Sequence, residues 1–550
     1  MKKKTIPYTY IFFLVIFSNG FFAQDFTLKI SSKRTNDIKI LDKIDFKKNH
    51  ADSTFLYNEV YRISDYLKNQ GYFTNIVENI AKVNNNNFTA YFSLGQKIDR
   101  VVIRKFKNGL KKETDSIVVP IEKLQSMLNL ASKKLDTEGK SFSKIQLKNI
   151  TIRGNTLFAE LEVYQSKKRN INRVIVKGYE LFPRSYIKHH FNISEQTVFN
   201  KEKIKEISDA TKSLKFVKEI KPPEVLFTKD STLLYIYLKK HQNNSFDGLV
   251  NFASDESGDV LFNGHVDLKL SNVLHAGENF ELFWNRVGNE RQEFKIATEI
   301  PFLLGSAFSL DSYFNIYKQD STFLNVKFHS GVSYNLNSKS NIAITYDSET
   351  SENLQEDTTT NNIEDFDNYF LGLQFEYRIP KNDYFLNDLF YVEINPTIGK
   401  RKFLDTSSNQ FKINFTASYL WELDQRSSMY IRNKTGYLNS NTYVDNELFR
   451  IGGANSIRGF NEQSIYTNTF SFFNIEYRYL TSQTSYLYSV TDIGTAEILA
   501  NNQTLLGLGV GYFFTMNTSQ ISVSSVVGKA SENNFDFKNA KIIIKWKVLF

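Results

Sequence analysis

The chain has 550 residues, of which 41% are hydrophobic, 23% charged and 15% aromatic, and it contains no cysteine. This composition excludes collagen-like and disordered chains, and the lack of cysteine excludes disulfides, thiol catalysis, cysteine-based zinc sites and a lipoprotein anchor. The net charge of +9 is unevenly spread: residues 25–245 hold 41 basic and 24 acidic side chains, whereas residues 246–550 hold 24 and 35.

The first 23 residues have the pattern of an export signal. Lys2, Lys3 and Lys4 precede the apolar run Ile11–Phe17, which is about half the ~20 residues that a spanning helix needs. This pattern predicts a cleaved signal peptide over residues 1–23, with processing after Ala23. An exported chain rarely meets nucleic acid, so the basic excess of residues 25–245 is interpreted as solvated surface and no nucleic-acid partner is expected.

Residues 25–241 contain three segments with the same order of signals: a strand, a helical stretch and further strands. We expect three small α+β domains, at residues 25–96, 98–168 and 170–241. The predicted helices are Phe55–Asn69, Ile121–Leu135 and Lys201–Leu214, and the predicted strands are Thr27–Ile30, Phe88–Leu94, Arg100–Lys105, Gln146–Arg153, Thr156–Tyr164, Arg173–Lys177, Glu219–Phe227 and Leu233–Lys239.

Two local features of these segments resemble POTRA domains, namely the turn Gln70–Phe73 after the first helix and the stretch Ile171–Glu180 that opens the third segment. The resemblance implies periplasmic modules whose unpaired edge strand accepts an extended client by strand addition. An unrelated periplasmic α+β array is the alternative.

Residues 246–550 alternate polar and apolar side chains over many runs of 9–13 residues. Along Phe411–Leu423, aromatic and aliphatic residues share one face, while the other face holds mostly polar residues. This pattern predicts an all-β, transmembrane antiparallel barrel of about sixteen strands, with apolar residues toward lipid and a polar lumen. In the final run, Trp546 and Phe550 face outward, and a chain that ends on an outward aromatic resembles the recognition signal of outer-membrane proteins.

One connection carries the most specific motif. Between the expected eleventh and twelfth strands lies the run Ile451–Phe460, IGGANSIRGF, in which Gly452 and Gly453 allow a tight re-entry of the chain. The run resembles the sixth-loop motif of the Omp85 superfamily, whose tip folds back into the barrel lumen. The residues that match the tip of the motif are Ile457, Arg458, Gly459 and Phe460.

A guanidinium inside a barrel needs carboxylate partners, because burying it alone costs several kcal/mol. Strand parity over Phe470–Leu480 turns Glu476 toward the lumen, and Asp492 lies in a Thr491–Gly494 element that resembles the DxG element of the same family. The resemblance implies that Glu476 and Asp492 hold Arg458. An exposed loop arginine is the alternative.

Two further motifs are interpreted as structural. The glycines of Gly507–Gly511 share one strand face and are interpreted as small luminal residues, since the segment continues as a strand where a nucleotide loop would open a helix. His189 and His190 lack carboxylates at metal-ligand spacing and are interpreted as a surface pair. No nucleophile–base set stands out, so neither an enzyme, a cofactor nor a metal site is expected.

The resemblance to the Omp85 superfamily covers the mature chain and implies a factor of the bacterial outer membrane with its N-terminal domains in the periplasm. Its implied partners are the lipid bilayer and unfolded outer-membrane or secreted client proteins, together with a periplasmic or inner-membrane-anchored partner at the repeats. The implied action is insertion or export of β-rich clients, without nucleotide, by strand addition and lateral opening. The alternatives are a two-partner-secretion transporter for a dedicated substrate and a passive porin.

Overall fold

The computed structural model describes residues 26–550 except 85, 108–109, 242, 255–259, 288–290, 356–361, 382–384, 386–387, 404–405, 499–500, 517 and 532–533. The predicted signal peptide, residues 1–23, lies outside the described residues. The chain divides into two compact units, Met1–Arg169 and Asn170–Phe550. Within the described part, no helix is long and apolar enough to cross a bilayer.

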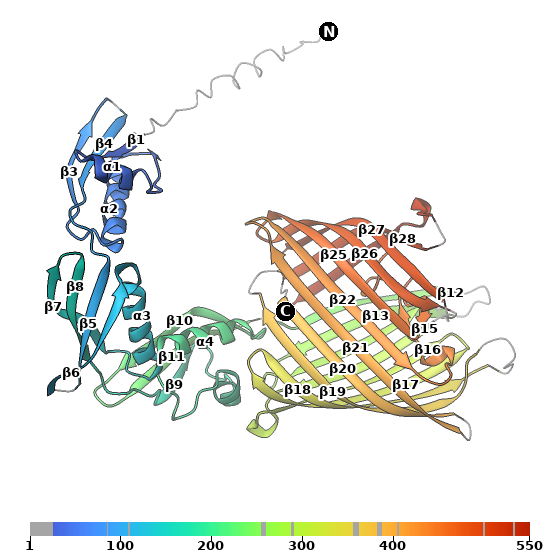
Figure 1. The fold of residues 1–550 in the computed structure, drawn as a ribbon. Helices are drawn as coiled ribbons and strands as arrows, with labels where there is room; N and C mark the ends of the chain where they lie inside the picture. The colour runs from blue at the N-terminus through green and yellow to red at the C-terminus, as the bar shows by residue number, and fades with distance from the viewer. Residues whose placement is uncertain are drawn as a thin grey trace, which may run out of the picture. The chain divides into compact units, whose positions relative to one another are not determined.

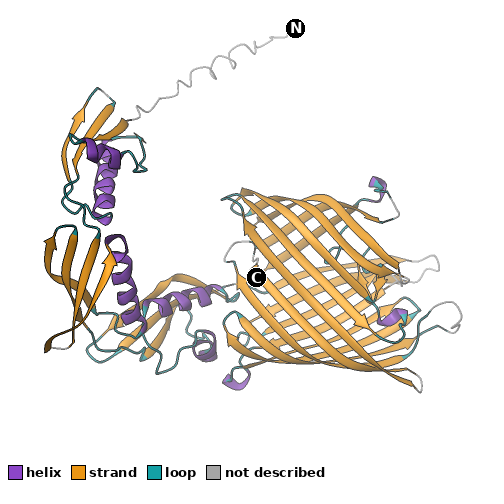
Figure 2. Ribbon diagram, viewed as in Figure 1, coloured by secondary structure: helices purple, strands orange, loops and turns teal. Residues whose placement is uncertain are grey.

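The first unit contains two small α/β sheets (Figures 1 and 2). In the first sheet the order is β2-β1-β4-β3, and in the second it is β6-β5-β8-β7. The elements are β1 Phe26–Ser31, α1 Thr35–Leu41, β2 Asn49–His50, α2 Ser53–Asn69, β3 Ile76–Lys82, β4 Asn87–Ser93, β5 Arg100–Lys107, β6 Leu110–Pro120, α3 Ile121–Thr137, β7 Lys144–Arg153 and β8 Thr156–Tyr164.

Helix α2 illustrates why these segments fold as they do. Asp52 caps its N-terminus by accepting from the Phe55 amide, and Gly71, at φ +97°, follows its last turn, where a left-handed residue favours glycine. Its apolar stripe of Leu56, Ile63 and neighbours is fully buried against β1 and β4. Each sheet keeps edge strands with one unpaired side, which is what strand addition would require.

The second unit begins with a third sheet of order β10-β11-β9 covered by helix α4. Its elements are β9 Arg173–Lys177, a π-helical turn at Tyr186–His190, α4 Lys201–Lys212, β10 Val217–Phe227 and β11 Thr232–Lys240. The parallel pairing of β9 with β11 repeats that of β1 with β4 and of β5 with β8. The third sheet, with three strands, thus shares the central parallel pair of the two four-stranded sheets.

Sixteen described strands then close into an antiparallel barrel, which confirms the predicted fold (Figure 1). Neighbouring strands follow chain order throughout. The strands are β12 Ser245–Ser254, β13 Val260–Ser271, β14 Asn279–Val287, β15 Arg291–Ile300, β16 Phe308–Gln319, β17 Phe323–Asn337, β18 Ser340–Asn353, β19 Phe366–Pro380, β20 Asp388–Phe403, β21 Thr406–Glu422, β22 Ser427–Asn439, β25 Thr469–Ser482, β26 Ser485–Ile498, β27 Asn501–Met516, β28 Ser519–Ala530 and β29 Lys541–Leu549.

The two faces of the wall have opposite chemistry. Outward side chains such as Leu373, Ile398 and Val510 are exposed and apolar, whereas inward ones such as Asn325, Arg401 and Asp492 are buried and polar. We call the end where Ser245 begins and Leu549 ends the near end. Exposed aromatics gather there, as expected for a lipid-facing band with an interfacial girdle: Phe246, Phe308, Tyr334, Tyr419, Trp421, Tyr477, Tyr479, Tyr512, Trp546 and Phe550.

The third sheet packs against two near-end turns of the barrel. Phe302, held at φ +52° between β15 and β16, is buried in the core of the third repeat and contacts the Tyr186 ring edge-on. The hydroxyl of Tyr179 lies 2.9 Å from His275 Nδ1 in the turn between β13 and β14. Buried aromatic side chains, with hydrogen-bonded hydroxyl groups, therefore form a packed interface between the third sheet and the barrel.

The interpretation of His189 and His190 as a surface pair is wrong. His189 Nε2 donates to the Gly305 carbonyl at 2.9 Å and its ring stacks on Phe302, so it belongs to the junction with the barrel. His190 is partly buried and donates from Nε2 to the Ala210 carbonyl, also at 2.9 Å. Two adjacent histidines in a hydrophilic stretch gave no periodicity from which this packing could be inferred.

Candidate functional site

The connection between the eleventh and twelfth barrel strands, β22 and β25, returns into the lumen. Short strands β23, Phe449–Ile451, and β24, Ile465–Thr467, pair with each other and carry the tip, residues 452–463. Gly452, Gly453 and Gly459 take φ values of +107°, +97° and +94°, which side-chain-bearing residues rarely adopt. The glycines of the motif therefore shape the re-entry.

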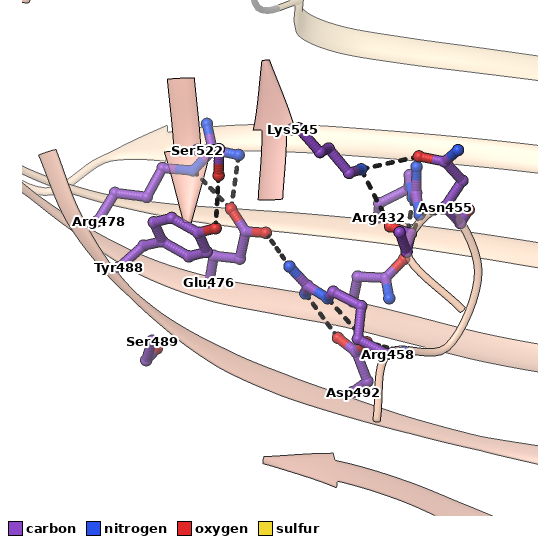
Figure 3. A network of polar contacts seen from close by, with 12 residues as sticks. Arg432, Asn455, Arg458, Glu476, Arg478, Tyr488, Ser489, Asp492, Ser522 and Lys545 are labelled. Carbon is purple, nitrogen blue, oxygen red and sulfur yellow. Dashed lines mark hydrogen bonds and ion pairs between the residues drawn. The ribbon is translucent and has the colours of Figure 1, made fainter. Parts of the chain in front are cut away.

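Arg458 lies at the centre of a buried charge network (Figure 3). Its Nε and Nη2 donate to the two carboxylate oxygens of Asp492 at 2.9 and 2.7 Å, and its Nη1 donates to Glu476 at 2.6 Å. Its backbone amide also donates to Asp492, at 2.7 Å. The Nε of Arg478 donates to the other carboxylate oxygen of Glu476 at 2.8 Å. Two guanidinium groups and two carboxylates thus balance, which buried charges require.

The three charged partners come from two adjacent strands. Glu476 and Arg478 lie on one face of β25, and Asp492 lies on the neighbouring strand β26 with no exposed side-chain surface. Along β26, Tyr488, Val490, Asp492 and Gly494 alternate as inward residues, so the parity at Asp492 is clean.

The apolar residues of the motif anchor the tip. Ile457 is fully buried in a small luminal cluster with Phe470, Phe472 and Leu505, and Phe460 packs against the same cluster. A luminal apolar cluster of this kind excludes water from the base of the loop and strengthens the adjacent ion pairs.

Two wall glycines form a seat for the tip. A Cβ at Gly507 would collide with the Arg458 carbonyl oxygen, and a Cβ at Gly528 would lie 2.7 Å from the Gly459 carbonyl oxygen. The backbone of the loop can therefore approach the wall only because β27 and β28 carry glycine at these positions. Gly507 faces the lumen as predicted, but its role as a seat depends on a loop that is distant in sequence.

Polar contacts extend the network to the last strand. Lys545 on β29 donates from Nζ to the Asn455 side-chain oxygen at 2.7 Å and to the Ala454 carbonyl at 3.0 Å (Figure 3). Arg432 on β22 donates to the Asn455 carbonyl at 3.2 Å and to the Asn474 side chain at 2.6 Å. No motif in the sequence singles out Lys545.

A second anchor holds the outer limb of the same loop and was not anticipated. Glu447 pairs with Arg401 of β20 and accepts from Gln410 of β21 at 2.9 Å, and all three are buried. Asn446 donates to Ser351 at 2.7 Å. No sequence signal distinguishes these residues from other charged or polar positions in a barrel wall.

The first and last strands meet in a short seam. Among the described residues, strands β12 and β29 pair only at Ser245–Leu549 and Phe246–Val548, whereas β12 pairs with β13 at ten positions and β28 with β29 at eight. The Phe550 amide adds one bond to the Asn244 carbonyl at 2.9 Å. Trp546 and Phe550 are exposed on the outer face, as their parity predicted.

Among the described residues no cluster of three or more His, Asp or Glu side chains could hold a metal ion.

A polar-lined barrel preceded by repeated α/β sheets and filled by an arginine-anchored loop defines a class of membrane protein. Solved structures similar to this chain include CdiB from Escherichia coli, with 13% identity and a TM-score of 0.53; the match covers 89% of this chain and 97% of CdiB. CdiB from Acinetobacter baumannii is similar with 12% identity and a TM-score of 0.53, and the match covers 90% of this chain and 98% of that one. BamA from Haemophilus ducreyi lacking POTRA domains 1–3 matches at 13% identity with a TM-score of 0.44, and the match covers 80% of this chain and 94% of that one.

No protein-family profile and no curated protein sequence matches the chain. The likeness is therefore one of fold: this chain shares the fold of the two CdiB structures over most of its length.

Proposed function

We propose that this protein is an outer-membrane factor that inserts or exports β-rich client proteins, with its N-terminal repeats in the periplasm. The observation that carries the proposal is the seam: two residue pairs join β12 to β29, beside a loop anchored in the lumen by Arg458. A wall closed by few hydrogen bonds can separate at low cost, because each bond contributes about 1 kcal/mol net.

The action follows from the chemistry of strand edges. An extended client would add to an edge strand of a repeat and then to the separated edges of β12 and β29, where its backbone groups replace the missing pairing. Client folding would drive release, so the action requires no nucleotide or cofactor and no catalytic residue. The contacts of Glu476 and Asp492 with Arg458 would keep the loop in place during this cycle.

A dedicated two-partner-secretion transporter is the second candidate, and the likeness in fold to the two CdiB structures does not distinguish it from the assembly factor. The three repeats of this chain favour the assembly factor, since the transporter family typically has two. A passive porin explains neither the repeats nor the anchored loop.

Depletion of the protein followed by proteomics of the outer membrane and the medium tests the proposal. Loss of many outer-membrane barrels supports the assembly factor, whereas loss of one secreted protein supports the dedicated transporter. Unchanged outer-membrane and secreted proteins, with altered uptake of small solutes, would contradict both and leave the porin.

A further inference from the structure

The tip of the sixth loop, residues 452–463, contacts each of the last five strands of the barrel. The contacts follow strand order: Asn474 on β25, Asp492 on β26, Gly507 on β27, Gly528 on β28 and Lys545 on β29. Since these strands are consecutive neighbours, the tip lies across the inner wall of one continuous segment of sheet that ends at the seam.

The last of these contacts is the one that reaches the seam strand. Lys545 Nζ lies 2.7 Å from the Asn455 side-chain oxygen and 3.0 Å from the Ala454 carbonyl, and Figure 3 shows it at a different part of the loop from Asp492, which contacts Arg458. Hydrogen bonds from an ammonium group are stronger than those between neutral groups. Arg432 holds the Asn455 carbonyl from β22, so Lys545 contacts a segment that is itself fixed.

Strand β29 has reason to need such a contact. It pairs with β28 at eight positions, but among the described residues no pair joins it to β12 on the N-terminal side of Val548. Most of its other edge is therefore open, and a strand with one paired edge separates more readily than one with two. Lys545 lies near the middle of this open stretch.

We propose that Lys545 is a positioning residue through which the loop straps the last five strands together and keeps β29 in place along its unpaired edge. The strap is a property of the barrel, present before any client arrives. Release of Asn455 from Lys545 then loosens β29 and the loop tip together. This residue lies outside the Arg458 network and adds a link between that network and the seam.

Hydrogen exchange of the full-length protein in detergent micelles, without client, tests the strap. Lys545→Met removes the donor and keeps the length of the side chain, and we expect about tenfold faster amide exchange over residues 541–549 and over the tip 452–463, as loss of a charged hydrogen bond predicts. Lys547→Met is the matched control, because Lys547 lies on the same face two residues along and makes no described hydrogen bond to the loop; its exchange should equal wild type.

A gain-of-contact variant keeps the test independent of barrel assembly. Asn455→Asp places a carboxylate opposite the ammonium, so exchange over residues 541–549 should slow several-fold, and Lys545→Met in the same chain should abolish that slowing. Wild-type exchange in both Lys545→Met and Asn455→Asp overturns the strap, as does equal acceleration in Lys547→Met. None of these results depends on whether depletion affects clients, so the strap and the proposed function fail separately.

Discussion

At the scale of single residues, Arg458 joins the loop to the barrel wall through Glu476 and Asp492, and we expect these contacts to keep the loop in the lumen. Replacing it by alanine leaves Glu476 and Asp492 buried with only Arg478 to neutralise them. Removing one partner of a buried ion pair costs about 3–5 kcal/mol, because the remaining charge is uncompensated. We therefore expect Arg458→Ala to release the loop and to lower the temperature at which the barrel unfolds in detergent, measured by heat-modifiable migration in electrophoresis.

The control for this variant is Arg426→Ala, which removes an arginine from an exposed near-end turn and should migrate as wild type. Arg458→Lys keeps the charge but cannot reproduce the two-pronged contact with Asp492, so it should fall between wild type and alanine. Wild-type heat-modifiability in Arg458→Ala would mean that the apolar contacts of Ile457 hold the loop without the charge network.

A second residue, His190, makes the third repeat sensitive to acid. Burial lowers the pKa of His190 to about 4, although the hydrogen bond to the Ala210 carbonyl opposes the shift. In the unfolded chain the pKa of this histidine is near 6.5. Between about pH 6.5 and 4, His190 is therefore protonated in the unfolded state and neutral in the folded state. Stability should therefore fall as pH falls through this window, by about 1.4 kcal/mol per pH unit at most, and level off below it.

Hydrogen exchange over α4, corrected for the intrinsic effect of pH, measures this loss. His190→Asn keeps an N–H donor for Ala210 but cannot titrate, so the difference between wild type and variant isolates His190 from other histidines. The same pH dependence in both chains would show that His190 is protonated without penalty in the folded protein.

At the scale of elements, periodicity predicted most of the architecture. Alternation over residues 246–550 gave a closed barrel of sixteen strands, because one face meets lipid and the other meets the lumen along every strand. Strand β6, Leu110–Pro120, was not predicted, since its run of Lys, Glu and Asp has low strand propensity and no alternation at its start. Helix α1, Thr35–Leu41, is too short to give a periodic signal.

For the candidate site too, the features that depend on neighbouring residues in one strand or motif could be predicted, and the contacts between distant segments could not. Parity within one strand placed Glu476 on the luminal face, and a family motif pointed to Arg458. The seat at Gly507 and Gly528, the contact of Lys545 with Asn455 and the pair Arg401–Glu447 join segments that lie tens of residues apart. Nothing in the local sequence specifies such pairs. The alternation along a strand determines which face a residue lies on, but it does not determine which residue it contacts across the lumen.

At the scale of the whole molecule, the proposed function leaves two alternative routes for a client, the seam and the lumen, and one crosslink distinguishes them. Phe246 and Val548 lie directly opposite each other on β12 and β29, at a separation that a disulfide can bridge with small adjustment. The chain has no cysteine, so Phe246→Cys with Val548→Cys introduces the only pair. If clients leave through the wall, oxidation should abolish complementation of a depleted strain, and reduction should restore it.

The matched control is Phe314→Cys with Phe328→Cys, an outward pair that faces across β16 and β17 in the same manner but joins strands paired at twelve positions. Its oxidation should leave complementation unchanged, because an ordinary strand pair has no need to separate. If protein with a fully crosslinked seam still complements, the wall stays closed during function. Export would then follow the lumen, and because Arg458 and Lys545 hold the sixth loop inside that lumen, the loop itself would have to move for every client that passes.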